Sequence, residues 1–375
     1  MQWLNSIEQA PDKYWQDSYP FTQKTFISAL EQQESINGDS GWQGHFLYDE
    51  QQHFVLPSFI KHHSYGEYVF DWGWADAYAR HGLNYYPKLI IAAPFTPATG
   101  PRIMSESGNI DGQALSHALQ AHCIDNNLSG VHILFCNDQE RELLAPHNWH
   151  ERKSVQFHWF NYGYQDFDDY LSRFKSRKRK AVKKERTSIE KQNIHITWLK
   201  TEHLTPQDWQ FFYQCYQSTY HMRGMQGYLT LNSFMQMGNT MGAQMKFVFA
   251  YQNNQPIACA LYFCDDKNLY GRYWGALKDF ENLHFELCYY QGIEYCIANG
   301  LTHFDPGTQG EHKIARGFEP VYTSSLHHLT HEGFHHAVGD FVQEESKSLA
   351  LYKQDCYQHL PFNEQNMPSP KTTIG

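Results

Sequence analysis

Hydrophobic and polar positions alternate along the chain in runs that predict strands and helices in turn. In the first 150 residues, the largely apolar runs 88–93 and 131–136 predict buried strands. Residues 111–126 have the spacing of an amphipathic helix. Residues 44–56 predict a hairpin, because the polar residues 49–52 separate two apolar stretches. The amino-terminal part therefore reads as alternating strands and helices that contain a hairpin.

The same order recurs later in the chain. A helix is predicted to open near Phe167 and to pass through a basic run, and a second helix is predicted to begin at Pro206, a favoured position for proline. A long helix from Leu283 to Asn299 should end at Gly300, which can adopt a left-handed cap. Strands are predicted at 194–199, 245–251, 256–263, 268–274, 302–304 and 321–329.

This recurrence predicts an α/β protein of two domains that arose by duplication. A length of 375 residues is long for one hydrophobic core. We expect a first domain at 1–150 and a second at 151–335 that carries a basic helix at 173–186. A C-terminal helix at 336–366 and a disordered tail at 367–375 should follow.

Composition and charge narrow the classes of function. Hydrophobic residues make up 41% and charged residues 19%, which is typical of a globular protein, and the net charge of −10 disfavours non-specific binding to nucleic acid. The eight cysteines form no C-x-x-C pair, and no signal peptide or membrane-spanning run is visible, so we expect a cytoplasmic protein. Motifs of P-loop hydrolases, Rossmann dehydrogenases, α/β-hydrolases and zincins are missing.

The basic run is the most local charge feature of the sequence. On a helix its cations would cover most of the circumference and could bind a polyphosphate or an RNA backbone. A solvated helix face explains the same run equally well. The candidate phosphate-binding residues are Arg177, Lys178, Arg179, Lys180, Lys183 and Lys184.

Aromatic residues surround an arginine in the run 269–276. Strand alternation predicts that Arg272 and Trp274 share one face with Tyr270, and that Tyr273 lies on the other. Arg272, Tyr273 and Trp274 could hold a carboxylate or a phosphate, although a surface arginine stacked on aromatic rings is an equal alternative.

The start of the long helix carries groups suited to acid–base chemistry. Glu286 and Tyr290 are four residues apart and share a helix face, as do His284 and Cys288. The Glu286 carboxylate and the His284 imidazole are candidate catalytic groups, since they could serve as base and acid, and Tyr290 is a candidate substrate-binding residue. They could also be ordinary first-turn residues, because the helix dipole favours glutamate there.

A glycine-rich loop follows the predicted strand 302–304, at a place where α/β folds often keep function. Its candidate substrate-binding and catalytic residues are Gln309, Gly310, Glu311, His312, Lys313 and Arg316. No metal site is predicted, because the histidines lack a recognised ligand spacing. In the first domain Asp71, Trp72 and Arg102 lie in unusual aromatic or proline-rich runs that could line a cleft or could be structural loops.

The runs 64–74, 94–102, 269–275, 283–291 and 307–318 resemble those of the FemAB-like proteins of the GNAT superfamily, which are associated with peptidoglycan biosynthesis and recognition. The resemblance covers about residues 5 to 360. It implies two tandem GNAT-like domains, each with a mixed, largely antiparallel sheet flanked by helices. It also implies acyl transfer to an amine. The wider Fem group uses aminoacyl-tRNA, whereas other GNAT proteins use acyl-CoA.

The sequence departs from the GNAT pattern at the expected CoA loop, because residues 275–282 do not match it. We therefore expect no tightly bound cofactor. Acyl-CoA, an acyl carrier or aminoacyl-tRNA would be the activated donor and an amine the acceptor; a tRNA partner and peripheral membrane contact stay open. The predicted reaction is direct attack of the amine, with Glu286 or His312 as base and with Arg272, Lys313 and Arg316 holding anionic groups.

Three other interpretations remain open at this point. The chain could be a non-catalytic GNAT-like module that binds a cell-wall precursor or RNA. It could be an assembly protein that uses the aromatic first domain as an interface. It could also transfer a long acyl chain to a lipid amine.

Overall fold

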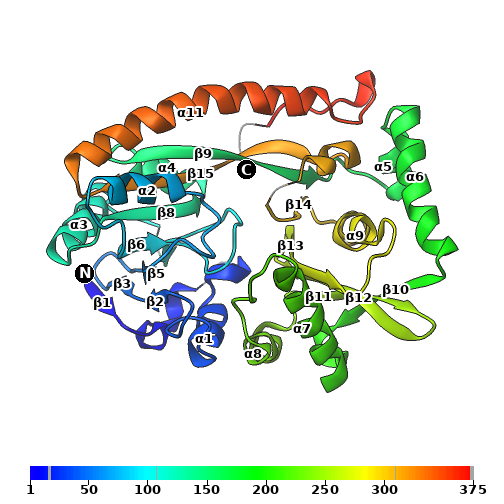
Figure 1. The fold of residues 1–375 in the computed structure, drawn as a ribbon, viewed down its shortest axis with the longest axis horizontal. Coiled ribbons are helices and arrows are strands. Elements are labelled where there is room, and N and C mark those ends of the chain that lie inside the picture. The colour runs from blue at the N-terminus through cyan, green and yellow to red at the C-terminus, as the bar shows by residue number, and fades with distance from the viewer. Residues whose placement is uncertain (16–17, 107, 309, 372–375) are drawn as a thin grey trace. The chain divides into compact units, whose positions relative to one another are not determined.

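The chain divides into two compact units (Figure 1). The computed structural model describes residues 1–15, 18–106, 108–308 and 310–371. Unit 1 comprises Met1–Val155 and Tyr322–Tyr352, and unit 2 comprises Gln156–Val321 together with residues 353–371. The division at Val155 lies close to the boundary expected near residue 150. The segment 322–352 belongs to unit 1, although 322–335 was predicted with the second domain.

Strand pairing explains why the chain returns to unit 1. Strand β15 (Glu319–Leu329) pairs antiparallel with β8 (Gly130–Cys136), from Ser324 opposite Cys136 to Leu329 opposite Gly130. The first part of α11 (Glu332–Gln358) then packs Val338 and Val342 into a small aromatic cluster with Trp74 and Tyr78. Both segments are therefore part of the hydrophobic core of unit 1.

Unit 1 contains two sheets. The larger runs in the order β15-β8-β6-β5-β2, in which only the β6–β8 pair is parallel. The smaller runs β1-β3-β4-β7 and is antiparallel throughout. The remaining strands of unit 1 are β1 (Gln2–Leu4), β2 (Trp42–Gly44), β3 (Phe46–Asp49), β4 (Phe54–Leu56), β5 (Ser58–Lys61), β6 (Lys88–Ile91), β7 (Met104–Ser105) and the start of β9 (His150–Phe160).

The predicted elements of unit 1 are present. β3 and β4 form the predicted hairpin, and β6 and β8 are the two buried strands. The predicted amphipathic helix is α3, where the Asp111 side chain accepts a hydrogen bond from the Ala114 N–H at 3.0 Å and caps the first turn. The helices of unit 1 besides α11 are α1 (Lys24–Gln32), α2 (Trp72–Arg80), α3 (Gly112–Asp125) and α4 (Asp138–Leu144).

Unit 2 is built on a mixed sheet in the order β10-β11-β12-β13-β14-β9. Its strands pair antiparallel except for β13 with β14, which are parallel. The central three strands are the meander that the sequence predicts. The strands are β10 (Ile194–Lys200), β11 (Met245–Gln252), β12 (Gln255–Cys264), β13 (Asn268–Ala276), β14 (His303–Asp305) and the end of β9.

Alternation of aromatic residues along these strands gives the sheet two covered faces. Phe247 of β11 packs on Trp209 and Phe212 of α7. Trp198 of β10 stacks on Tyr295 of α10, with ring centroids 4.6 Å apart. The helices are α5 (Phe167–Ser172), α6 (Ser176–Lys191), α7 (Pro206–His221), α8 (Leu231–Met241), α9 (Leu283–Phe285) and α10 (Gln291–Asn299).

The predicted helix through the basic run is interrupted at residues 173–175. Phe174 forms a bridge with Phe362, and the Lys175 N–H donates to the Pro361 carbonyl at 2.9 Å. Phe174 and Lys175 therefore leave the helix, Arg173 caps the end of α5, and α6 begins at Ser176 instead of residue 173. The partner segment lies almost two hundred positions further along the chain, so local sequence does not reveal the break.

The C-terminal segment that was predicted to be disordered has contacts as far as residue 371. The Tyr357 hydroxyl donates to the Pro368 carbonyl, and the Lys371 ammonium lies 4.4 Å from the centroid of the Phe160 ring. Residues 372–375 lie outside the described residues.

Candidate active site

A pocket of about 370 Å³ lies in unit 2 beside the third meander strand, and we call it the β13 pocket. Residues of β12, β13, the helix that follows β13 and the loop after β14 line it. Of the residues predicted from sequence, it brings together Arg272, Tyr273, Trp274, His284, Gly310, His312 and Lys313. Three separate stretches of the chain therefore converge on one cavity.

A β-bulge shapes one wall of the pocket. Leu261 of β12 pairs with Tyr273, but the next residue, Tyr262, pairs with Gly271, so Arg272 is the extra residue. Arg272, Tyr273 and Trp274 consequently all line the pocket, which corrects the simple alternation predicted for β13.

A π-helical segment, Glu286–Tyr290, connects α9 to α10. The wider turn replaces the continuous α-helix predicted for 283–299, and segments of this kind are frequent at functional sites. His284, Cys288 and Tyr289 line the β13 pocket. Glu286 lines a different, open groove of about 700 Å³ along α6.

The loop after β14 carries Lys313 into the pocket wall. Its ammonium group donates to the Gly307 carbonyl at 2.6 Å and lies 3.4 Å from that of Thr308, and the residue is 1% exposed. Burial lowers the pKa of Lys313 to about 8, opposed by the negative charge of Asp305. A lysine in this state still carries a proton at neutral pH but holds it weakly.

Glycine is required at the start of the short 3-10 helix Glu311–Arg316. Gly310 has φ +101°, and a Cβ there would lie 2.4 Å from Cε1 of the His312 ring. A larger residue would displace the imidazole, so the glycine keeps His312 in its place.

Tyr289 and His312 form a hydrogen-bonded pair at the pocket. The Tyr289 hydroxyl oxygen lies 2.7 Å from Nε2 of His312. Partial burial, assisted by the positive charges of Lys313 and Arg316, lowers the pKa of His312, although the residue as a whole is exposed. Its imidazole is therefore neutral at pH 7. Burial raises the pKa of Tyr289, which keeps the phenol protonated. A neutral imidazole beside a protonated phenol can accept a proton through the hydroxyl group.

His284 is the second histidine of the pocket. Its ring lies 4.7 Å from that of Trp274 and 6.0 Å from that of His312. Burial lowers its pKa to about 4, again with the neighbouring cations contributing. The imidazole is therefore neutral and packs as part of the aromatic wall.

The charge of the pocket favours anionic ligands. Arg223, Arg272 and Lys313 line it, and no aspartate or glutamate is among its described lining residues. Arg223 follows α7 and was missed by sequence reasoning, because an isolated arginine after a helix carries no distinguishing pattern. Tyr289 was also missed as a functional residue, since its spacing is that of a helix packing position.

The other predicted residues of this region lie outside the pocket lining. Glu286 is 3% exposed and accepts hydrogen bonds from Arg186 at 2.9 and 3.1 Å. The Tyr290 hydroxyl accepts from Nε of Arg316 at 3.0 Å. Glu311 is exposed, and Gln309 lies outside the described residues.

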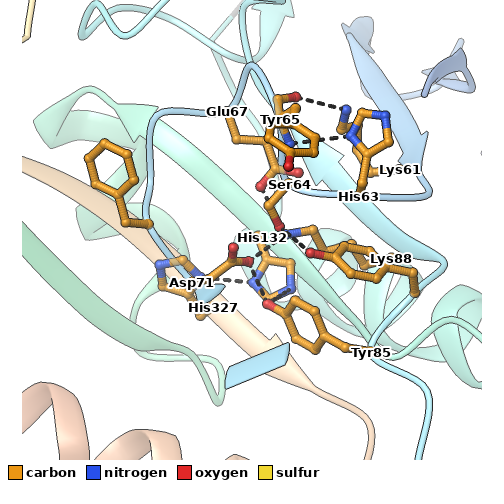
Figure 2. A network of polar contacts seen from close by, with 12 residues as sticks. Lys61, His63, Ser64, Tyr65, Glu67, Asp71, Tyr85, Lys88, His132 and His327 are labelled. Atoms are coloured by element: carbon orange, nitrogen blue, oxygen red, sulfur yellow. Dashed lines mark hydrogen bonds and ion pairs between the residues drawn. The ribbon is translucent and has the colours of Figure 1, made fainter. Parts of the chain in front are cut away.

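The predicted residues of unit 1 have local roles. The Arg102 guanidinium is buried and donates to main-chain carbonyl groups, including Leu134 at 2.8 Å and Ala98 at 2.7 Å. Asp71 accepts from the Lys88 ammonium and from the Tyr85 hydroxyl in a buried network (Figure 2). Trp72 is 40% exposed. These contacts occupy the charged groups of Asp71 and Arg102 within the fold.

The basic residues lie on α6 and spread their charge outward. Arg177, Lys180, Lys183 and Lys184 are exposed, whereas Lys178 and Arg179 are half-buried. Lys183 is paired with Asp168 at 2.7 Å. Buried Val182 and Ile189 anchor the helix. The outer face of α6 is therefore a cationic surface on a packed helix.

The sequence profile of the FemAB-like family, described as one of peptidoglycan biosynthesis and recognition, matches residues 4–364. The chain belongs to the FemAB-like family. No curated protein matches the sequence.

Solved structures share the fold of this FemAB-like chain at low identity. FemX is 10% identical with a TM-score of 0.51, over 90% of this chain and all of its own (100%). L-PGS from Bacillus licheniformis is 8% identical with a TM-score of 0.53, over 82% of this chain and 92% of its own. A tandem GNAT protein from the clavulanic acid biosynthesis pathway is 8% identical with a TM-score of 0.43, over 88% of this chain and 98% of its own.

The predicted fold class, an α/β protein of tandem GNAT-like domains, is confirmed by the mixed sheets and by the likeness to FemX. In the described ranges of this FemAB-like chain, no helix combines the length and apolar character needed to cross a membrane. Likewise, no three His, Cys, Asp or Glu side chains of the described residues are grouped so that they could hold a metal ion.

Proposed function

We propose that the β13 pocket transfers an acyl or aminoacyl group from an activated donor to an amine, by direct attack and without a covalent enzyme intermediate. The observation that carries the proposal is the Tyr289–His312 pair, which shares a pocket with the buried cation of Lys313. Membership of the FemAB-like family supports acyl or aminoacyl transfer in general terms.

In the proposed reaction, the amine nitrogen bonds to the carbonyl carbon of the donor. The amine proton passes to the Tyr289 oxygen while the Tyr289 proton passes to Nε2 of His312, across the 2.7 Å contact. This relay suits a phenol whose pKa is raised by burial, because Tyr289 never needs to become a stable phenolate. His312 is therefore the proposed base in place of Glu286, whose carboxylate is engaged by Arg186.

The negative charge on the carbonyl oxygen needs a partner during attack. Lys313 is proposed for this role, because a buried ammonium group acts in a low-dielectric site and is held by carbonyl oxygens, with no carboxylate among its hydrogen-bond acceptors. Backbone N–H groups of the meander are further candidates. When the intermediate collapses, the carbon–oxygen or carbon–sulfur bond to the leaving group breaks. The proton on His312 passes to the Tyr289 oxygen while the Tyr289 proton passes to the leaving oxygen or sulfur, which restores both side chains.

The proposed donor is aminoacyl-tRNA, with an amine of a peptidoglycan precursor as acceptor. The family is described as one of peptidoglycan biosynthesis and recognition, which supports this acceptor. The absence of the CoA loop from residues 275–282 and the exposed cations of α6 favour a polyanionic donor over acyl-CoA. Arg223 and Arg272 are proposed to bind anionic groups of either substrate at the pocket.

The test is single-turnover transfer of a radiolabelled amino acid from charged tRNA to an amine-bearing muropeptide. We expect a labelled product that resists hydroxylamine, because an amide forms. His312→Gln and Tyr289→Phe should each reduce the rate by about 100-fold or more, the range of general acid–base catalysis. His203→Gln, an exposed histidine outside the pocket, is the matched control.

Thermal unfolding of each variant separates loss of chemistry from loss of fold. Transfer at the wild-type rate in both pocket variants would refute the assignment of the base. Transfer from acyl-CoA but not from aminoacyl-tRNA would refute the assignment of the donor and leave the base in place.

A further inference from the structure

Helix α6 carries exposed cations on one face and a half-buried pair of opposite charges on the other. Its outer face carries the exposed cations Arg177, Lys180 and Lys184. Its inner face carries Glu185 and Arg186, both half-buried. Glu185 forms an ion pair with Arg316, and Arg186 forms ion pairs with Glu286 and Glu294. The helix therefore has polar contacts in addition to its apolar packing.

Glu185 binds Arg316 of the 3-10 helix Glu311–Arg316. The Arg316 guanidinium donates to Oε1 of Glu185 at 2.8 Å and to Oε2 at 3.2 Å. The Tyr290 hydroxyl donates to the same carboxylate. The Arg316 side chain is 7% exposed in this pair, so the interaction is shielded from salt and water more than a surface ion pair is.

Arg316 in turn holds the main chain of His312. Its NH1 group donates to the His312 carbonyl at 2.7 Å. Its guanidinium carbon lies 3.5 Å from the centroid of the Phe285 ring, which is in contact with the His312 ring at 5.6 Å. Polar contacts and a stacked ring thus fix Arg316, and Arg316 fixes the turn that carries His312.

We infer that Glu185 and Arg316 are positioning residues for His312. Arg316 anchors the His312 backbone, and Glu185 both orients the guanidinium and offsets the positive charge that it brings beside the imidazole. The inference deepens the proposed function, since it rests on His312 being the base. It connects the helix proposed to bind the polyanionic donor with the group proposed to take the proton.

Several charged or titratable groups face His312. Tyr289 reaches it from the π-helical segment, His284 from α9, and Lys313 and Arg316 from its own element. Glu185 is the carboxylate that contacts this group, through Arg316. Removing Glu185 leaves the Arg316 charge without its offset, whereas removing Arg316 takes a positive charge away. The two changes should therefore move the His312 titration in opposite directions.

The experiment follows the His312 imidazole by NMR in the full-length, histidine-labelled protein, from about pH 4 to about pH 9. Its signals are identified by their loss in His312→Gln. We expect Glu185→Gln to lower the pKa of His312 and Arg316→Gln to raise it, each by about half a unit or more. Glu190→Gln removes the same charge from an exposed position of α6 and should leave the titration unchanged.

Shifts of the same sign in both variants, or an equal shift in the Glu190→Gln control, would overturn the inference. If Arg316→Gln does not fold, the inference is tested by Glu185→Gln and Glu190→Gln alone. The pKa of His312 should fall in the first variant and stay unchanged in the second. Arg316→Lys retains the positive charge but loses the guanidinium group that bonds Glu185 and the His312 carbonyl at the same time. This variant should therefore leave the pKa of His312 near that of the wild type. It should lower kcat more than it raises KM. No substrate is needed for the titration, so its failure is distinguishable from failure of the proposed transferase reaction.

Discussion

Two buried lysines, one in each unit, have opposite surroundings. Lys88 of unit 1 is 0% exposed and donates to Glu67 at 2.8 Å, to Ser64 at 2.9 Å and to Asp71 (Figure 2). Lys313 of unit 2 is 1% exposed and donates to main-chain carbonyl groups. Carboxylates raise the pKa of Lys88, although burial opposes them, whereas burial lowers that of Lys313 to about 8.

The difference shows what decides whether a buried charge stabilises the fold or takes part in binding and catalysis. A cation neutralised by carboxylates has little left to offer a ligand, and it lies in a packed network. A cation that donates hydrogen bonds to main-chain carbonyl groups at the wall of a pocket can respond to negative charge that develops beside it. Residue type and burial are the same in both places, so the partners decide the role.

The largest expected effect is on stability when Lys88 is replaced. Lys88→Met leaves Glu67 and Asp71 buried without their cation, which should lower the free energy of unfolding by about 3–5 kcal/mol. Urea unfolding measures the change. The control is Lys183→Met, which breaks an ion pair of 2.7 Å with both side chains exposed and should cost less than about 1 kcal/mol. Equal costs in the two variants would remove the contrast.

The second effect concerns activity. Lys313→Met should reduce transfer by about 100-fold, because it removes the proposed stabiliser of the carbonyl oxygen. The same change should alter the free energy of unfolding by no more than about 1–2 kcal/mol. The variant loses the hydrogen bonds of the ammonium group, but it also loses the cost of burying a charge, and the two effects oppose each other. Single-turnover transfer and urea unfolding on one preparation check both. A stable Lys313→Met variant with wild-type transfer would show that the pocket cation is structural after all.

The smallest effect uses the buried carboxylate of Glu319, whose pKa burial raises although Lys371 and Lys353 oppose the shift. Burial raises the pKa of Glu319 to about 7, and the Tyr162 hydroxyl donates to it at 2.8 Å. Because the folded pKa lies above the usual 4.5, the carboxyl group stabilises the fold below about pH 4.5, and this contribution is lost as pH rises through 7.

The free energy of unfolding of the wild type should fall between about pH 5 and pH 8 as Glu319 ionises. Glu319→Gln should make this fall smaller, by on the order of 2 kcal/mol. Urea midpoints at the two pH values measure the change. Glu344→Gln, an exposed position of α11, should leave the slope unchanged. An unaltered slope in Glu319→Gln would mean that the carboxylate is better solvated than its burial indicates.

Local patterns were sufficient for most elements of the fold. The meander β11–β13 follows from apolar runs separated by turn residues, and Gly300 adopts the left-handed cap (φ 68°) that its position predicts. The sequence predicted three catalytic candidates, and the structure places two of them, His284 and His312, in the β13 pocket. The third, Glu286, does not line it. Helix periodicity could not make that distinction, since the π-helical segment changes which side chains share a face.

Contacts between distant segments decided the rest. The bridge from Phe174 to Phe362 ends the predicted helix early, and the β12–β13 bulge sets Arg272 beside Tyr273 at the pocket. The residues of the chain alone specified its family, most of its strands and helices, and the chemical groups present in its glycine-rich loop. Tertiary structure alone gave Lys88 its carboxylates and Lys313 its carbonyls, because the charge state of a buried group depends on the dipoles and charges that other segments bring to it.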